Sequence, residues 1–134
     1  MGDEIRVAIR TDADVVTARQ EARAMGAELG FSSTDLTLLA TAISEVARNI
    51  TTYAGEGEVA LRVLHDGGRE GIEVVASDDG PGIDDLERAM QDGFTTGTGL
   101  GLGLPGARRL VDEFDVRTQP GSGTRVRLVK WTRA

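Results

Sequence analysis

A chain of 134 residues with a hydrophobic fraction of 40% can build one packed domain and leaves little room for a second. The absence of cysteine and the single histidine, His65, exclude disulfides, thiolate metal sites and histidine-rich metal clusters. The formal net charge of −7 argues against a general nucleic-acid-binding protein, because such a protein needs a basic face.

The N-terminal sequence MGDEIRVAIR is charged throughout and lacks the apolar core of a signal peptide. No apolar run approaches the roughly 20 residues that span a bilayer. We therefore expect one domain over residues 1–134, located in the cytoplasm, with neither a nucleic acid nor a membrane as partner. The negative charge also means that a polyanionic ligand would have to bind through local devices, namely a metal ion, backbone N–H groups or a helix N-terminus.

The first part of the chain predicts one strand and two helices. Residues Glu4–Arg10 alternate between apolar and polar, which is typical of a half-buried strand. Apolar residues then recur at helical spacing from about Asp12 to Leu29. Ser32 and Ser33 can cap the next helix, which carries its apolar residues on one narrow face and runs to about Tyr53.

The rest of the chain predicts four strands and one further helix. A strand with Val59, Leu61 and Val63 on one face is followed by a hairpin turn at 66–69 and a return strand over Gly71–Asp78. The later elements are a Gly-rich segment, a helix over about Leu104–Glu113 with Phe114 continuing its apolar face, and strands over Asp115–Thr118 and Thr124–Lys130. This order predicts a two-layer α/β sandwich, in which helices cover one face of a mixed, mostly antiparallel sheet.

Two polar residues of the second helix, Glu45 and Asn49, lie one turn apart, about 6 Å along the axis. Both fall on the side away from the apolar stripe, and one interpretation is two solvated side chains. The other is a carboxylate that accepts a proton beside an amide oxygen that binds Mg²⁺, an ion that takes few protein ligands. Arg48 lies at another azimuth and is interpreted as a surface residue or a member of a structural salt bridge.

Asp78 continues the apolar face of its strand, so its carboxylate points toward the buried side, where it needs hydrogen-bond donors. The segment that follows, Asp79-Gly80-Pro81-Gly82, has little side-chain bulk, and an ordinary Asp-Gly turn explains it. Alternatively, Asp78 accepts a hydrogen bond from the amino group of adenine, and the glycines let the backbone pass close to the base.

A Gly-rich run over Gly97–Gly106 opens the third predicted helix, and Pro105 suits the first turn of that helix. Such a run presents backbone N–H groups and a positive dipole end to phosphate, although flexible loops are also rich in glycine. The run is not a P-loop, because no Gly-Lys-Ser/Thr is present. It also lacks the βαβ setting of a dinucleotide-binding fold.

The last motif, Gly121-Ser122-Gly123-Thr124, precedes the final strand and predicts a hairpin turn. Thr124 is also able to place its hydroxyl beside Asp78 and a bound adenine. Each of the four motifs is a weak or moderate signal alone, and their order along the chain carries the argument.

In this order the motifs resemble the N, G1, G2 and G3 boxes of the GHKL superfamily, which comprises gyrase, Hsp90, histidine kinases and MutL. They are Glu45-x-x-x-Asn49, Asp78-x-Gly80-x-Gly82, Gly99-x-Gly101-x-Gly103 and Gly121-x-Gly123-Thr124. The resemblance covers nearly the whole chain and implies the Bergerat α/β sandwich with ATP and Mg²⁺ as cofactors. The chain resembles the stressosome switch kinases in its short length and in the segments 43–50, 101–106 and 130–131. These kinases belong to the serine kinases that regulate bacterial sigma factors.

The resemblance also implies roles for single residues. Glu45 would be the general base, Asn49 the Mg²⁺ ligand and Asp78 the residue that recognises adenine, with a lid over the phosphates from about residue 83 to 98. The implied ATP-binding residues are Asn49, Asp78, Gly80, Gly82, Gly99, Gly101, Gly103, Leu104 and Thr124. Leu102 departs from the pattern, because a smaller residue is expected between the glycines, and this bears on the packing of the lid.

The implied activity is transfer of phosphate from ATP to a serine or threonine of a STAS-domain stressosome protein. The released kinase would then bind and activate a PP2C-type phosphatase. Gyrase-like ATPases carry transducer domains that this sequence does not show, and His65 lies at a strand end rather than on the dimerisation helix of a histidine kinase. An anti-sigma factor that phosphorylates its anti-anti-sigma factor shares the same boxes and is the alternative, which binding to a sigma factor would distinguish.

Overall fold

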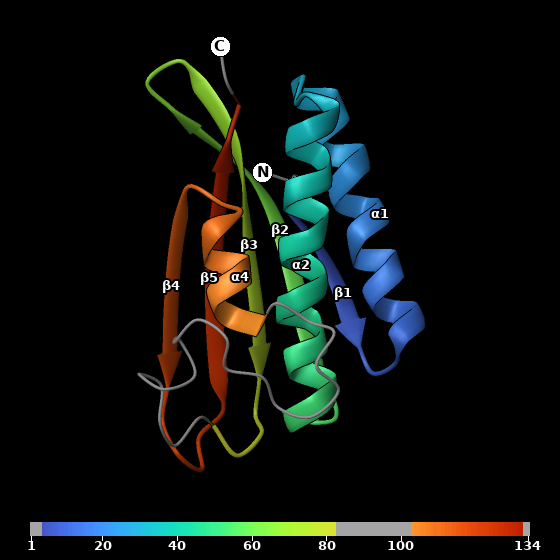
Figure 1. Cartoon of the computed structure of the whole chain (residues 1–134), viewed down its shortest axis with the longest axis vertical. Coiled ribbons are helices and arrows are strands. Elements are labelled where there is room, and N and C mark those ends of the chain that lie inside the picture. Colours follow the sequence, from blue (N-terminus) through green and yellow to red (C-terminus); the bar gives the residue numbers. More distant parts are fainter. Residues whose placement is uncertain (1–3, 83–102, 133–134) are drawn as a thin grey trace.

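A layer of helices packs on one face of a five-stranded antiparallel sheet in the computed structural model, which describes residues 4–82 and 103–132 (Figure 1). The sheet order is β1-β2-β3-β5-β4, and each pair of neighbouring strands is antiparallel. The two-layer α/β sandwich expected from the sequence is therefore confirmed. In chain order the elements are β1 (Glu4–Ile9), α1 (Asp12–Leu29), α2 (Ser33–Tyr53), β2 (Gly57–Asp66), β3 (Arg69–Asp78), α4 (Gly103–Arg109), β4 (Glu113–Thr118) and β5 (Thr124–Trp131).

The two long helices begin at residues whose side chains satisfy free backbone N–H groups. At the start of α1, the Asp14 carboxylate accepts hydrogen bonds from the N–H groups of Arg10 and Thr11, at 2.9 and 3.1 Å. At the start of α2, the Ser32 hydroxyl accepts from the N–H of Asp35 at 3.1 Å. Within residues 4–82 and 103–132, no helix is both long enough and apolar enough to cross a membrane.

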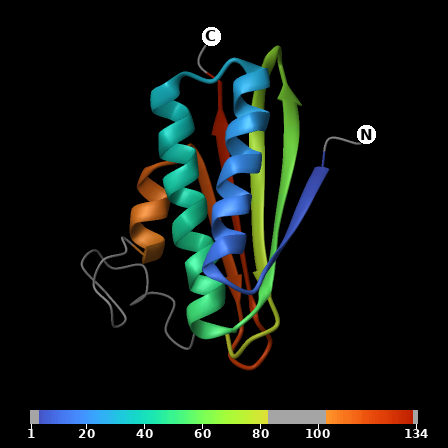
Figure 2. The ribbon, with the colours of Figure 1, turned by 90° about the vertical axis from the view of Figure 1, so that its right-hand side faces the viewer.

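The strands alternate as the sequence predicts, and their apolar side chains face the helices. Figure 2 shows α1 and α2 side by side over the sheet, with α4 beside α2. The buried apolar strand residues that belong to the core under the helices are Val7, Ile9, Val59, Leu61, Ile72, Val74, Ala76, Val126 and Leu128. They form one aliphatic core with the inner faces of α1 and α2, and this core fixes the strand ends relative to α2.

The third helix is shorter than predicted. α4 ends at Arg109, whereas the apolar spacing extends the helix to Glu113 and places Phe114 on its face. This expectation is wrong because the backbone changes partner: Asp112 N–H donates to the carbonyl of Val129 at 2.9 Å, and Phe114 pairs with Leu128 in the sheet. A single sequence period cannot separate a helix face from a turn and strand that pack on the same core.

Candidate active site

The side chain of Glu45, a residue of α2, is buried where α4 packs against α2. Its side chain is 8% exposed, and its Oε1 accepts a hydrogen bond of 2.9 Å from the backbone N–H of Gly103. Of the two interpretations of Glu45, the one that makes it a solvated side chain is therefore wrong. The apolar stripe of α2 faces the sheet, but α4 packs against a second side of α2, which a helical projection of α2 alone cannot show.

Arg48 and Asn49 follow Glu45 on α2. Arg48 Nη1 lies 3.4 Å from Glu45 Oε2, and its side chain is 53% exposed, so Arg48 is a partially exposed salt-bridge residue as one interpretation of the sequence holds. Asn49 is half-buried one turn beyond Glu45. An amide oxygen next to a carboxylate is a suitable ligand type for a hard cation such as Mg²⁺, so the donor chemistry at Asn49 fits the expected ion.

Asp78 is the last residue of β3, and its partner across the sheet is Thr124 of β5. Asp78 Oδ1 accepts a hydrogen bond of 2.9 Å from the N–H of Gly80. Opposite residues of an antiparallel pair project from the same face, so Thr124 and Asp78 project from the same face of the sheet. Thr124 is buried, and its Oγ1 lies 2.9 Å from Oγ1 of Thr118.

Thr118 is a residue of this region that the motif analysis missed. It ends β4 directly opposite Thr124, so Asp78, Thr124 and Thr118 form one row across three strands. Its hydroxyl also donates to the carbonyl of Gly123 at 3.1 Å. The signal in the sequence is its position before a turn whose other end carries Thr124, but the strand pairing is needed to make this visible.

The glycine motifs at 80–82 and 121–123 lie next to this row, and they pack against each other through their backbones. Gly121 N–H donates to the carbonyl of Pro81 at 2.6 Å. Gly82 has a φ of 77°, and a Cβ placed there would collide with the backbone of Gln119 in the opposite turn. A Cβ on Gly123 would collide with the backbone carbonyl at the end of β3. The lack of side chains is thus what allows the two loops to meet.

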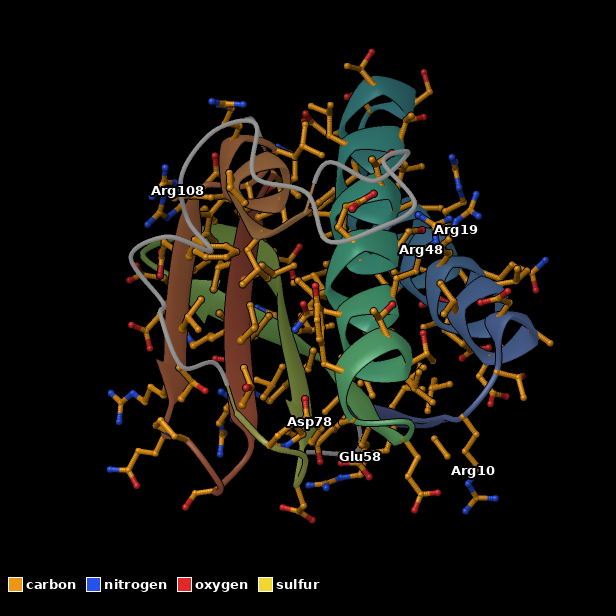
Figure 3. The ribbon with its side chains drawn as sticks, turned by 60° about the horizontal axis from the view of Figure 1, so that its bottom comes forward. Arg10, Arg19, Arg48, Glu58, Asp78 and Arg108 are labelled. Atoms are coloured by element: carbon orange, nitrogen blue, oxygen red, sulfur yellow. The ribbon has the colours of Figure 1, made fainter. Side chains whose placement is uncertain are left out.

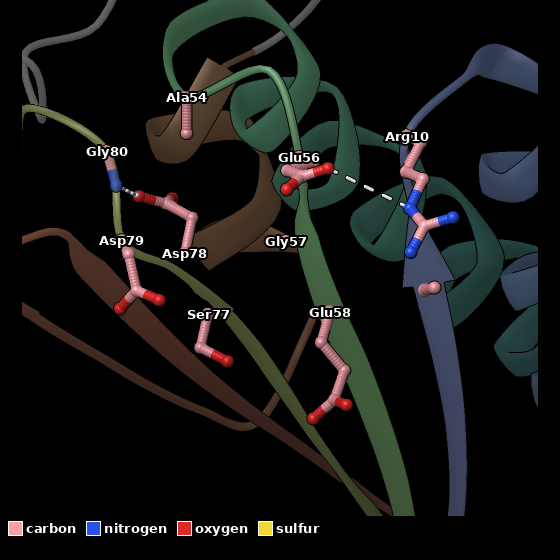
Figure 4. Close-up of a pocket in the computed structure, with 10 residues that line it drawn as sticks. Arg10, Ala54, Glu56, Gly57, Glu58, Ser77, Asp78, Asp79 and Gly80 are labelled. Carbon is pink, nitrogen blue, oxygen red and sulfur yellow. Dashed lines mark hydrogen bonds and ion pairs between the residues drawn. The ribbon is translucent and has the colours of Figure 1, made fainter.

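A cavity of about 570 Å³ opens beside Asp78 at the ends of β1, β2 and β3 (Figure 4). Gly80 lies against the end of α2, and a Cβ on it would come within 2.5 Å of the Ala54 Cβ. On the opposite side of the cavity, Arg10 Nε lies 3.8 Å from Glu56 Oε2. The lining residues are Ala8, Arg10, Ala54, Glu56, Gly57, Glu58, Ser77, Asp78, Asp79 and Gly80.

The structure therefore gathers the expected site residues into two groups, joined by α2. Glu45, Arg48 and Asn49 lie along α2, with Gly103 and Leu104 opening α4 beside it, and Leu104 is buried. The second group lies at the end of β3, where Figure 3 shows Asp78, and it consists of Asp78, Gly80, Gly82 and Thr124. Gly99, Gly101, Leu102 and the expected lid over 83–98 lie outside the described residues.

Comparison with protein families gives one matching model, which describes the histidine kinase-, DNA gyrase B- and HSP90-like ATPases and matches residues 34–133. The chain is 47% identical over 133 residues to the serine/threonine-protein kinase RsbT of Bacillus subtilis (strain 168), covering 99% of this chain and 100% of RsbT. It is 33% identical over 120 residues to the anti-sigma F factor of Thermoanaerobacter sp. (strain X514), covering 85% of this chain and 82% of that protein.

Two solved structures share the fold. The RsbU and RsbW domains of a Mycobacterium tuberculosis protein superpose with a TM-score of 0.69 at 21% identity, over 98% of this chain, which spans 33% of that longer chain. A structure of the SiaB–SiaC complex of Pseudomonas aeruginosa superposes with a TM-score of 0.59 at 15% identity, over 96% of this chain and 88% of that chain. At these identities the likeness concerns the fold alone.

Proposed function

The chain belongs to the family of histidine kinase-, DNA gyrase B- and HSP90-like ATPases and is a serine/threonine-protein kinase that uses ATP; we propose that it phosphorylates a STAS-domain protein and, once released, activates a PP2C-type phosphatase in a sigma-factor switch. One observation supports the transfer chemistry in this proposal. A buried carboxylate, Glu45, meets the backbone N–H of Gly103, which is 58 residues away in the sequence and belongs to the glycine-rich motif. A proton acceptor and a phosphate-binding segment need this proximity to act on one bound nucleotide.

In the proposed complex the nucleotide extends along α2. The purine lies at the end of β3, where the Asp78 carboxylate accepts a hydrogen bond from its amino group, and Thr124 lies beside Asp78. The phosphates lie toward α4, where the backbone N–H groups of Gly103 and Leu104 are the proposed donors. Ala54 is nine positions beyond Glu45, which corresponds to about 13.5 Å of helix. An extended nucleoside triphosphate is long enough to cover such a distance.

Asn49 is the residue that would hold Mg²⁺, one turn beyond Glu45. When bound, this ion supplies positive charge to the phosphates. The proposed task of Asn49 is to present its amide oxygen toward the same side of the site as the Glu45 carboxylate, so that phosphates and acceptor are brought together.

The transfer step assigns the proton to Glu45. The carboxylate takes the proton of the serine or threonine hydroxyl as the oxygen–phosphorus bond forms to the γ-phosphoryl group. The bond from that phosphorus to the β–γ bridging oxygen breaks, and ADP leaves with the electron pair. Positioning and electrostatics contribute most of the rate enhancement in phosphoryl transfer, and the base contributes a smaller share.

The test combines the chain, Mg-ATP labelled at the γ-phosphate, and a STAS-domain protein encoded beside it. We expect label on one serine or threonine of the STAS protein and none when that residue is replaced by alanine. The free kinase should raise the activity of a PP2C-type phosphatase, and an excess of unphosphorylated STAS protein should reverse the effect. A chain that binds Mg-ATP but labels no STAS protein contradicts the proposed substrate.

The second candidate is an anti-sigma factor with kinase activity toward its anti-anti-sigma factor. The 33% identity to an anti-sigma F factor favours it, although the identity to RsbT is higher and covers more of the chain. Direct binding to a sigma factor, measured by calorimetry with Mg-ATP or Mg-ADP present, separates the two candidates. The switch kinase should bind the phosphatase and not the sigma factor.

A further inference from the structure

The two oxygens of the Glu45 carboxylate have different partners, and this points to a role for Arg48. Oε1 accepts from the N–H of Gly103 at 2.9 Å, and Oε2 lies 3.4 Å from Arg48 Nη1. We propose that Arg48 is a positioning residue for phosphoryl transfer, which holds Oε2 so that Oε1 is presented to the acceptor hydroxyl. The inference rests on the proposed function of Glu45 as the base.

The first argument concerns competition for one backbone N–H. The Gly103 N–H that contacts Oε1 is also a proposed phosphate donor, and a single N–H makes one good hydrogen bond at a time. When a phosphate oxygen takes this N–H, Oε1 loses its partner and becomes free to accept a proton. Arg48 remains in contact with Oε2, so the carboxylate keeps an anchor at the moment it must act as a base.

The second argument concerns geometry and burial. A glutamate has three rotatable bonds, so a carboxylate with no fixed partner points in several directions. The guanidinium of arginine is planar, always charged and forked, and it orients a carboxylate better than a flexible ammonium does. The Glu45 side chain is 8% exposed and Arg48 is 53% exposed, so the pair reaches from the buried site to the surface of α2.

An ordinary surface salt bridge is the alternative, and the chain contains a matched example. Arg69 and Asp66 are also three residues apart and also 3.4 Å from each other, and Arg69 is 48% exposed. The side chain of Asp66 is 65% exposed, whereas that of Glu45 is buried. Exposed pairs of this kind contribute little to stability. Arg69 lies at the start of β3, at the opposite end of that strand from Asp78, and also stacks 4.0 Å from the centre of the Trp131 ring, so Arg69→Ala is a control for kcat and not for stability.

The test measures γ-phosphate transfer to the STAS protein with Arg48→Ala, Arg48→Lys and Arg69→Ala. For Arg48→Ala we expect kcat to fall about tenfold, part of the roughly 10²–10⁴ that a positioned base contributes, while the Kd for Mg-ATP and the melting temperature stay unchanged. Arg48→Lys should restore part of kcat, because it keeps the charge without the fork. Arg69→Ala should leave kcat at the wild-type value.

A double-variant cycle then ties the effect to Glu45. In a Glu45→Gln background, Arg48→Ala should change the remaining rate by less than about twofold, because there is no base left to position. A normal kcat for Arg48→Ala, a loss of Mg-ATP binding, or an equal fall in both backgrounds each overturns the positioning role. If Glu45→Gln itself transfers phosphate normally, the proposed base is wrong and the inference falls with it. An impaired Glu45→Gln beside a normal Arg48→Ala overturns the inference alone.

Discussion

The carboxylate of Glu45 and the backbone N–H of Gly103 form a 2.9 Å hydrogen bond that joins the middle of α2 to the first residue of α4. This bond links a candidate base to a candidate phosphate-binding segment, and it gives a hydrogen-bond partner to a glutamate whose side chain is only 8% exposed. Substitution of Glu45 should therefore act on transfer, and substitution of residues at the end of β3 should act on nucleotide binding.

Replacing Glu45 by glutamine should leave nucleotide binding intact and remove transfer. The glutamine side chain has nearly the same shape and retains an oxygen that can accept from Gly103, but it cannot take a proton at neutral pH. We expect the Kd for Mg-ATP to change by less than about twofold and the single-turnover rate to fall by about 10²–10⁴. Calorimetry and rapid-quench assays measure the two quantities. Wild-type transfer by Glu45→Gln would show that another group accepts the proton.

Replacing Asp78 by asparagine should weaken the binding of Mg-ATP more than it slows the transfer step. The substitution removes the charge from the carboxylate proposed to accept from the adenine amino group, and hydrogen bonds to charged groups are worth about 1.5–3 kcal/mol. The Kd for Mg-ATP should therefore rise by roughly 10- to 100-fold. Asp79→Asn is the control, because Asp79 lines the same cavity beside Asp78. Equal weakening by both substitutions would point to general electrostatics rather than to recognition by Asp78.

Replacing Gly80 by alanine should weaken binding for a steric reason. The new Cβ would lie 2.5 Å from the Ala54 Cβ and 2.9 Å from the Ala54 Cα, so the loop must move away from the end of α2. Inserting a methyl group into a packed contact costs about 1–3 kcal/mol. We expect a lower melting temperature and a higher Kd for Mg-ATP, measured by calorimetry.

The second substitution Ala54→Gly tests this explanation of the Gly80→Ala effect. It removes the nearer of the two atoms that the new methyl group meets, and should restore part of both stability and affinity. If Ala54→Gly gives no recovery, the contact with Ala54 is not the cause of the loss.

Replacing Asp14 by asparagine should destabilise the protein in a pH-dependent way. Hydrogen bonds from the backbone N–H of Arg10, and then of Thr11, lower the pKa of the Asp14 carboxyl from its ordinary value of 3.8. A carboxyl with a lowered folded-state pKa stabilises the fold above its ordinary pKa, and this stabilisation is lost as the pH falls through the folded-state pKa. Urea unfolding should thus show wild type as more stable at pH 7, with the difference shrinking below about pH 4.

Asp12, an exposed residue in the same first turn of α1, provides the matched control for Asp14. Asp12→Asn should have a smaller effect, since it changes only the interaction of a charge with the helix dipole. A gap between wild type and Asp14→Asn that stays constant from pH 7 to pH 3 would mean that the carboxylate charge is not the source of the stability.

Much of the fold follows from local patterns, because each is set by neighbours in the chain. The period-two strands, the stop after Leu29 and the long apolar stripe of α2 were all predictable. The pairing of Thr124 with Asp78 is not local, because α4 and β4 lie between β3 and β5 in the chain, and it was suggested only by the order of the motifs. The residue at which α4 ends was not predictable from local patterns. The apolar residues of α4 continue into Phe114 of β4, and only pairing with Leu128 of β5 decides that these residues leave the helix.

The sequence by itself determined the order of the four motifs, the two-layer sandwich and the chemical character of each candidate residue. Tertiary structure alone decided that Glu45 is buried, that Arg48 and Gly103 share its carboxylate, that Thr118 joins the row with Asp78, and that two glycine loops meet through their backbones. The physical reason is that burial and hydrogen-bond partners depend on segments that are distant along the chain. The period of a helix shows which residues share a face, but it does not show which other helix packs against that face.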